Sequence, residues 1–228
     1  MGGIRSVVLV SGGMDSLVTA ALAADAGGTA FLHVSYGQRT EARERTAFRR
    51  IADHFDIRHR LEAAMPAVRA IGGSALTDPA IPIRTDGVDR AGIPASYVPF
   101  RNAQLLALAV SWAEVLGARS VWIGAVEEDS SGYPDCREAF FHAFGESVRL
   151  GTARPGAIRI EAPLLHKTKA EIVRLGLRLG VPFELSWSCY VSEEEACGTC
   201  DSCRLRLGAF RENGVVDPIR YAPPASRP

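Results

Sequence analysis

The sequence predicts an α/β protein built on a doubly wound parallel sheet, followed by a small segment that binds zinc. Short apolar runs alternate with helical patterns, which is typical of a parallel sheet covered by helices on both faces. The first apolar run leads into a glycine-rich turn, and a cluster of four cysteines follows residue 185. With 228 residues, the chain is long enough for one such domain to bury a sizeable core.

Periodicity assigns five strands and five helices. The expected strands are residues 4–10, 29–35, 57–61, 120–124 and 158–162, and the expected helices are residues 15–26, 41–54, 102–116, 137–150 and 169–179. Thr168 stands three residues before Glu171, which is the pattern of a capping box at the start of the last helix. We expect residues 1–185 to form the α/β domain, residues 186–220 a zinc-binding segment of helix and loop packed on it, and residues 221–228 a disordered tail.

Composition excludes several classes of partner. Acidic and basic residues balance at 26 each, so no overall field attracts nucleic acid or an anionic membrane. The first residues lack the pattern of a secretory signal, and polar residues interrupt the longest apolar stretch, residues 103–118, which is too short to span a bilayer. We therefore expect a cytoplasmic protein with no nucleic-acid or membrane partner.

The turn SGGMDS at residues 11–16 is the clearest functional signal. Glycines allow the backbone to approach a ligand closely, and the N-terminus of the following helix attracts anions. A Walker A loop needs a lysine followed by serine or threonine, and no lysine follows Gly13. The alternative is a tight turn that is rich in glycine for structural reasons alone. The turn thus predicts a phosphate-binding loop that differs from Walker A.

Four of the five cysteines, Cys189, Cys197, Cys200 and Cys203, lie close together near the end of the chain. Without a secretory signal, metal binding is favoured over disulfides. Four thiolates form a closed tetrahedral zinc site with no open position for water, so its role is structural. An iron–sulfur cluster or a redox dithiol is the alternative, but the spacing favours zinc. We expect the metal to fold this segment, which lacks a core of its own.

Seven motifs extend the signal along the chain: SGGMDS at 11–16, YGQR at 36–39, GSALT at 73–77, YVPFRN at 97–102, SGYPDC at 131–136, WSCY at 187–190 and CGTCDSC at 197–203. In this order they resemble the 7-cyano-7-deazaguanine synthases, PP-loop ATP pyrophosphatases with a Rossmann-like, HUP-type fold. The resemblance implies a homodimer that uses ATP with Mg²⁺ and holds one structural zinc per chain. The implied reaction converts 7-carboxy-7-deazaguanine and ammonia to 7-cyano-7-deazaguanine (preQ0) through adenylated acid and amide intermediates.

The chain departs from the family pattern in two substrate-facing motifs. Thr40 stands where the family usually has histidine, and Ser130 where it usually has tyrosine. A paralogue acting on a related 7-deazapurine is therefore one alternative. A PP-loop enzyme that modifies tRNA is another, but it would need a basic surface for the phosphate backbone. The third alternative is a non-catalytic nucleotide-binding zinc module.

The resemblance and the residue chemistry together assign the site. The nucleotide is expected to contact Val10, Ser11, Gly12, Gly13, Met14, Asp15, Ser16, Leu17, Val18, Thr19 and Ala20. The expected catalytic residues are Ser11, Asp15, Ser16, Lys167 and Arg101. Asp15 either holds Mg²⁺ or caps the helix, and both readings stay open. Lys167 and Lys169 could each reach the triphosphate as point charges, and a solvated helix start is the alternative, especially for Lys169.

The deazapurine needs stacking and a group that reads its polar edge. Tyr97, Arg101, Tyr133 and Asp135 are the expected substrate-binding residues. An aspartate can accept from a guanine-like N1–H and exocyclic amine, although Asp135 could instead cap the helix that follows. Arg101 suits recognition of a carboxylate or phosphate, with a structural ion pair as its alternative. Cys136 is expected to be a buried thiol without a covalent role.

Overall fold

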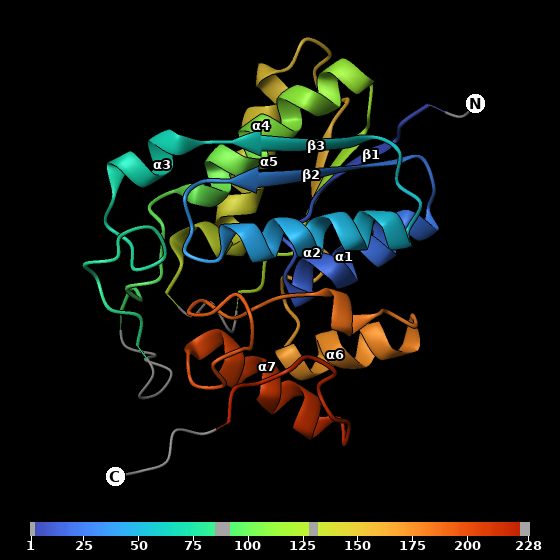
Figure 1. Cartoon of the computed structure of the whole chain (residues 1–228). Coiled ribbons are helices and arrows are strands. Elements are labelled where there is room, and N and C mark those ends of the chain that lie inside the picture. Colours follow the sequence, from blue (N-terminus) through green and yellow to red (C-terminus); the bar gives the residue numbers. More distant parts are fainter. Residues whose placement is uncertain (1–2, 85–91, 128–131, 224–228) are drawn as a thin grey trace.

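The computed structural model describes residues 3–84, 92–127 and 132–223. At its centre, five parallel strands form one sheet in the order β3-β2-β1-β4-β5 (Figure 1). The strands are β1 (Ser6–Leu9), β2 (Thr29–Ser35), β3 (Arg60–Ala64), β4 (Ser120–Ile123) and β5 (Arg159–Glu161). This topology confirms the predicted doubly wound sheet. Strand order reverses between β1 and β4, and ligands bind at such a switch point.

Helices cover both faces of the sheet (Figure 1). One face carries α1 (Met14–Asp25) and α2 (Glu41–His54), with α6 (Lys169–Arg178) packed on α1, and the other carries α4 (Arg101–Leu116) and α5 (Glu138–Gly151). Strand β1 is buried on both sides: Val8 packs in the core under α1 and α2, while Val7 and Leu9 pack under α4. Such complete burial explains why β1 has a continuous apolar sequence. None of the helices in the described residues is long and apolar enough to cross a bilayer.

The sequence misplaced one strand and missed two helices. Strand β3 begins at Arg60 rather than at Ile57, because Ile57 is buried just before the strand whereas the strand itself lies at the sheet edge. Its residues alternate between exposed and half-buried, so no apolar run marks it. The short α3 (Pro66–Ile71) and α7 (Asp201–Glu212) were not assigned as separate helices. The capping box is confirmed, because Thr168 Oγ1 accepts from Glu171 N–H (3.2 Å) and Glu171 Oε2 accepts from Thr168 N–H (2.9 Å).

The C-terminal segment packs on the α/β core and contains a buried ion pair. Helix α7 packs on α6, which in turn packs on α1. Arg206 of α7 is 1% exposed and donates two hydrogen bonds to the carboxylate of Asp217, at 2.6 and 2.8 Å. The same guanidinium also donates to Ser186 Oγ at 2.7 Å and to the Phe183 carbonyl at 3.2 Å. This one side chain therefore links α7 to the end of the 3-10 helix Phe183–Leu185 before it and to the loop around Asp217 after it. The predicted disordered tail begins too early, because Tyr221 forms a β-bridge with Ala196 and its hydroxyl donates to Asp217 Oδ2 at 2.6 Å; residues 224–228 lie outside the described residues.

Replacing Arg206 with methionine is expected to lower the free energy of unfolding by about 3–5 kcal/mol, because the Asp217 carboxylate is left buried without its partner. Urea denaturation followed by circular dichroism measures the effect. Arg211→Met, at an exposed position of the same helix, is the matched control and is expected to change stability by less than about 0.5 kcal/mol. Equal losses for the two variants would show that the ion pair does not stabilise the segment.

Candidate active site

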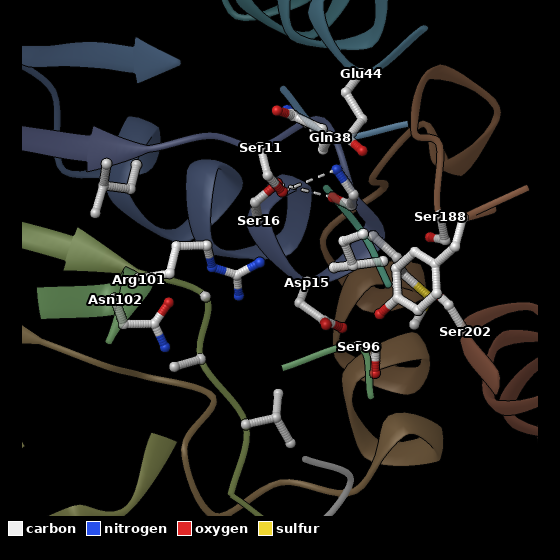
Figure 2. A pocket seen from close by; sticks show the side chains of 18 of the residues that line it. Ser11, Asp15, Ser16, Gln38, Glu44, Ser96, Arg101, Asn102, Ser188 and Ser202 are labelled. Atoms are coloured by element: carbon white, nitrogen blue, oxygen red, sulfur yellow. Dashed lines mark hydrogen bonds between the residues drawn. The ribbon is translucent and has the colours of Figure 1, made fainter. Parts of the chain in front are cut away.

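A pocket lies at the carboxyl ends of β1, β2 and β4, where the strand order reverses. Its cavity volume is about 290 Å³, and its lining includes the turn after β1, the first residues of α4 and α6, and part of the segment from 187 to 205 (Figure 2). Parts of the chain that are far apart in sequence thus meet at one place. This is the position that a doubly wound sheet offers to a nucleotide or another small ligand.

The glycine turn shapes one wall of this pocket. Gly12 has a φ of +95°, and a Cβ atom there would lie 2.5 Å from the backbone oxygen of Glu44, so only glycine fits. Ser11 Oγ accepts from Gly13 N–H at 3.2 Å and donates to Ser16 Oγ at 3.1 Å. Ser16 Oγ donates in turn to the Gly13 carbonyl at 2.9 Å. Among the described residues, no side chain caps the start of α1. The residues of its first turn line the pocket.

Only part of the predicted nucleotide-binding stretch, residues 10–20, lines the pocket. Six of its residues line the pocket, namely Val10, Ser11, Gly13, Met14, Asp15 and Ser16. Gly12 supports the turn against α2 instead. The other four residues of the stretch do not line the pocket but are buried within α1, and they are Leu17, Val18, Thr19 and Ala20. Their position is consistent with a structural role in seating α1.

Asp15 and Lys169 form the charged centre of the pocket. Lys169 Nζ lies 2.6 Å from Asp15 Oδ2, and both residues line the cavity. The second oxygen, Oδ1, is buried and accepts no hydrogen bond from the described residues. Such an unpaired carboxylate oxygen fits the donor that a hard cation such as Mg²⁺ requires. Asp15 makes no capping bond through its side chain, so the capping alternative has no support in this geometry.

Lys169, rather than Lys167, reaches the pocket. Thr168 is the N-cap of α6, so Lys169 is the first helical residue and extends toward the start of α1. Lys167 lies before the cap and is not part of the cavity wall. The expectation that Lys167 is the site lysine is therefore not supported by the geometry. The capping box sets where α6 begins, and it therefore decides which of the two lysines extends into the pocket.

Arg101 is a half-buried cation in the pocket wall, with its Nε atom buried. It begins α4 directly after Phe100, whose left-handed backbone (φ +54°) turns the chain there. Its Nη1 donates to the Tyr36 hydroxyl at 2.9 Å, and the guanidinium lies 5.6 Å from the Tyr36 ring centroid. Burial raises the pKa of Tyr36, so the hydroxyl stays neutral and does not balance the charge. Arg101 forms no salt bridge with a described carboxylate, so the alternative of a structural ion pair is not observed.

The other expected substrate residues separate into a pocket layer and a supporting layer. Tyr133 lines the cavity, and its hydroxyl hydrogen-bonds Ser96 Oγ at 2.7 Å. Tyr97 packs against Tyr133 with ring centroids 5.5 Å apart, and its hydroxyl accepts from Phe100 N–H. Asp135 is buried and its Oδ2 accepts from Asn102 N–H at 2.8 Å, so it caps α4 rather than the helix that follows it. Neither Tyr97 nor Asp135 lines the cavity.

The four cysteines form a compact group that could hold a metal ion. Their Sγ atoms all lie within 4.8 Å of one another. Backbone N–H groups of residues 191, 192 and 197 point at Cys189 Sγ, at 3.3–3.4 Å, and the N–H of Cys200 points at Cys197 Sγ at 3.3 Å. Hydrogen bonds of this kind stabilise thiolates, the form that binds metal. The donor set of four sulfur atoms fits zinc, and it leaves no protein ligand of another kind.

The cysteine segment also builds the pocket. Trp187, Ser188, Tyr190 and Ser202 line the cavity beside the glycine turn. The N–H of Trp187 donates to the Gly12 carbonyl at 2.8 Å, which joins the two segments directly. Thr40 Oγ1 donates to the carbonyl of Cys189 at 3.2 Å. Thr40, one of the two departures from the family pattern, thus contacts the cysteine segment. The other departure, Ser130, lies outside the described residues, as does Ser131.

Several lining residues were not singled out by sequence reasoning as site residues. They are Tyr36, Gln38, Glu44, Trp187, Ser188, Tyr190, Asp201 and Ser202. Tyr36 and Gln38 belong to the YGQR motif, and three of the others belong to WSCY, so the motifs themselves carried a signal. Glu44 lay outside any motif. Its position follows from the contact of α2 with the glycine turn, which the sequence does not display.

Comparison with known proteins identifies the family. The family model described as "Queuosine biosynthesis protein QueC" matches residues 5–214. The chain belongs to the QueC family. The matched span includes the glycine turn, Arg101, Lys169 and all four clustered cysteines. The family assignment therefore covers every segment that lines the pocket.

Relatives within this family are similar over nearly their whole length. A 7-cyano-7-deazaguanine synthase from Chloroherpeton thalassium is 56% identical over 219 residues, which cover 96% of this chain and 97% of that protein. The protein of the same name from Chlorobium phaeobacteroides is 57% identical with the same coverage. Among solved structures, the NMN synthetase from Francisella tularensis aligns with 97% of this chain and 90% of that one, at 13% identity and a TM-score of 0.46.

Proposed function

We propose that this chain converts 7-carboxy-7-deazaguanine and ammonia to 7-cyano-7-deazaguanine, with ATP cleaved to AMP and pyrophosphate at each of two activations. The observation that carries the proposal is the QueC family match, which spans the whole pocket. Relatives with more than half of their residues identical carry the name of this synthase. The pocket adds a glycine turn at a helix start and a half-buried arginine, which suit a nucleotide and an acid.

In this proposal the turn after β1 binds the phosphates of ATP. The backbone N–H of Gly13 and the hydroxyls of Ser11 and Ser16 are the donors. Lys169 adds a positive charge on the same side of the cavity. Asp15 would hold Mg²⁺ through its unpaired oxygen, and the bound ion would neutralise charge on the phosphate oxygens. These groups favour attack at the α-phosphate by stabilising the leaving pyrophosphate.

The proposed acid-binding side of the pocket consists of Arg101 and the aromatic wall. Arg101 orients the substrate carboxylate, and Tyr133 stacks on the deazapurine ring. Asp135 and Tyr97 are proposed to support the residues that contact the substrate: Asp135 holds the start of α4, and Tyr97 packs on Tyr133. The carboxylate becomes reactive only after adenylation, because AMP is a far better leaving group than oxide. The amide that forms is then adenylated on oxygen and loses AMP to give the nitrile.

We propose one zinc ion on the four cysteines, with a structural role. The cluster has no open ligand position, and its segment contributes Trp187, Ser188 and Tyr190 to the pocket. A homodimer in the cytoplasm, without nucleic acid, completes the proposal. The net charge of zero supports the absence of a nucleic-acid partner.

Incubation of the purified chain with 7-carboxy-7-deazaguanine, ammonium and MgATP tests the function. We expect 7-cyano-7-deazaguanine by mass spectrometry, with two AMP per nitrile. Formation of ADP in place of AMP, or turnover of ATP without nitrile, contradicts the proposal. Metal analysis of the same preparation is expected to find about one zinc per chain.

A further inference from the structure

Glu44 places a carboxylate in the pocket wall beside the glycine turn. It extends from α2, and its own backbone oxygen lies against Gly12. Oε1 accepts from Thr40 Oγ1 at 2.9 Å, and Oε2 accepts from Gln38 Nε2 at 3.1 Å. A carboxylate offers about four acceptor positions, so these two bonds orient the group and leave acceptor capacity on each oxygen. Figure 2 shows Glu44 and Arg101 reaching toward the pocket from different sides.

The surroundings of Glu44 raise the pKa of its carboxyl group above the usual value for glutamate. Burial raises its pKa to about 7, against the hydrogen bonds from Gln38 and Thr40, which favour the charged form. The charged groups that act on it are Arg101, which stabilises the carboxylate, and Glu41, which opposes it. Tyr36 is neutral because burial raises its pKa as well. Glu44 can therefore take up and release a proton near neutral pH.

The other two carboxylates of the pocket are less suited to this task. Asp15 Oδ2 is already paired with Lys169 Nζ at 2.6 Å. Asp201 lies in the first turn of α7, directly after Cys200 of the cysteine cluster. Ammonium, the predominant form of ammonia in neutral water, cannot attack carbon because its electron pair is protonated. A pocket that uses ammonia therefore needs a group that binds the cation and removes one proton.

We propose that Glu44 binds ammonium in the pocket and removes one proton from it, so that ammonia is released next to the activated acid. This inference rests on the proposed function and adds a residue to it. The proton passes from ammonium to a Glu44 oxygen, and the freed electron pair of nitrogen forms the C–N bond to the acyl-adenylate carbonyl. The C–O bond to AMP then breaks, and AMP leaves with the electron pair of that bond. The amide nitrogen loses a further proton to water. Gln38 and Thr40 position the carboxylate.

Glu44→Gln separates proton removal from the other steps. With ammonium at pH 7, its kcat/KM is expected to fall about 10²-fold, the typical effect of losing a general base. Hydroxylamine is a weaker base that is largely unprotonated at this pH, so hydroxamate formation by the variant is expected to stay near the wild-type rate. Exchange of pyrophosphate into ATP, driven by the carboxylic acid without any nucleophile, is also expected to be retained. In the wild type, ammonium-dependent kcat/KM rises with pH through about 7 as Glu44 loses its proton.

Glu41→Gln is the matched control. Glu41 lies on the same helix and accepts from Gly37 N–H at 3.0 Å, but it does not line the cavity. It is expected to keep the ammonium reaction. Equal loss of the ammonium and hydroxylamine reactions in Glu44→Gln would overturn the inference and show a structural role for Glu44, as would an unchanged ammonium reaction. If the wild type shows no exchange that depends on the acid, the proposed function itself fails, whatever Glu44 does.

Discussion

Removal of metal from the four-cysteine cluster is expected to unfold residues 187–223 and to abolish nitrile formation. Structural zinc contributes about 10–16 kcal/mol to the folding of small thiolate sites, which is comparable to the whole stability of a typical domain. The cluster segment has a small core of its own, made largely of the cysteines, Trp187 and Ala196. Without the metal, this core would not compensate the entropy of ordering the chain.

The loss would extend to the pocket because the segment forms part of its wall. Trp187 donates to the Gly12 carbonyl, and the carbonyl of Cys189 accepts from Thr40. Unfolding the segment breaks both bonds and exposes the glycine turn. We therefore expect metal removal to weaken ATP binding as well as turnover. Isothermal titration with a non-hydrolysable ATP analogue, before and after treatment with a strong chelator, measures this directly.

Cysteine variants give the control for this prediction. Cys200→Ser is expected to lose zinc and to show the same unfolding by circular dichroism. Cys136→Ser, at the one buried cysteine outside the cluster, is expected to retain zinc, because Cys136 lies near Asn102 and away from the other four. A zinc-free protein with an unchanged melting temperature and unchanged ATP affinity would contradict a structural metal.

The core of the fold was predictable because its strands are buried on both faces. β1 and β2 consist of residues that pack against helices on each side, so their apolar sequences stand out. Strand β3 shows the limit of this reasoning: as an edge strand, it alternates in exposure and carries polar residues such as Arg60 and Glu62. Its position was set by pairing with β2 rather than by its own pattern. Pairing is a tertiary property that a single sequence does not display.

The residues of the candidate site also differ in how far the sequence could predict them. The glycine turn and the cysteine cluster are local in sequence, so spacing alone identified them. The functions of Lys169, Asp135 and Glu44 depend on which distant element each side chain meets. Asp135 illustrates the point, because a turn residue that was expected to cap the next helix, or to read the substrate, caps α4 instead. Contacts across 30 or more residues of chain decided these cases, and they follow from packing rather than from local pattern.

Arg101→Met is expected to lower kcat/KM for the carboxylic acid about 10²- to 10³-fold while leaving the free energy of unfolding unchanged or higher. The guanidinium is half-buried, donates to the neutral Tyr36 hydroxyl, and has no salt bridge with a described carboxylate. Glu44 acts on this charge only through space, without a salt bridge, so an anion that enters the pocket finds a guanidinium with no carboxylate bonded to it, and an interaction of this kind contributes to binding and to the transition state. Replacing a poorly compensated buried charge by an apolar side chain is often neutral or stabilising.

The variant Arg206→Met gives a comparison that separates loss of stability from loss of activity. Arg206 is buried with Asp217 as its partner, whereas Arg101 is half-buried and is proposed to gain its partner from the substrate. The first substitution should reduce stability and the second should reduce activity, measured by urea denaturation and by initial rates on the same preparations. Arg101→Lys is expected to recover only part of the lost kcat/KM, because an ammonium group cannot form the paired hydrogen bonds of guanidinium to a carboxylate. A large loss of stability in Arg101→Met with normal kcat/KM would instead mean that Arg101 anchors α4 against Tyr36 and takes no part in binding the acid.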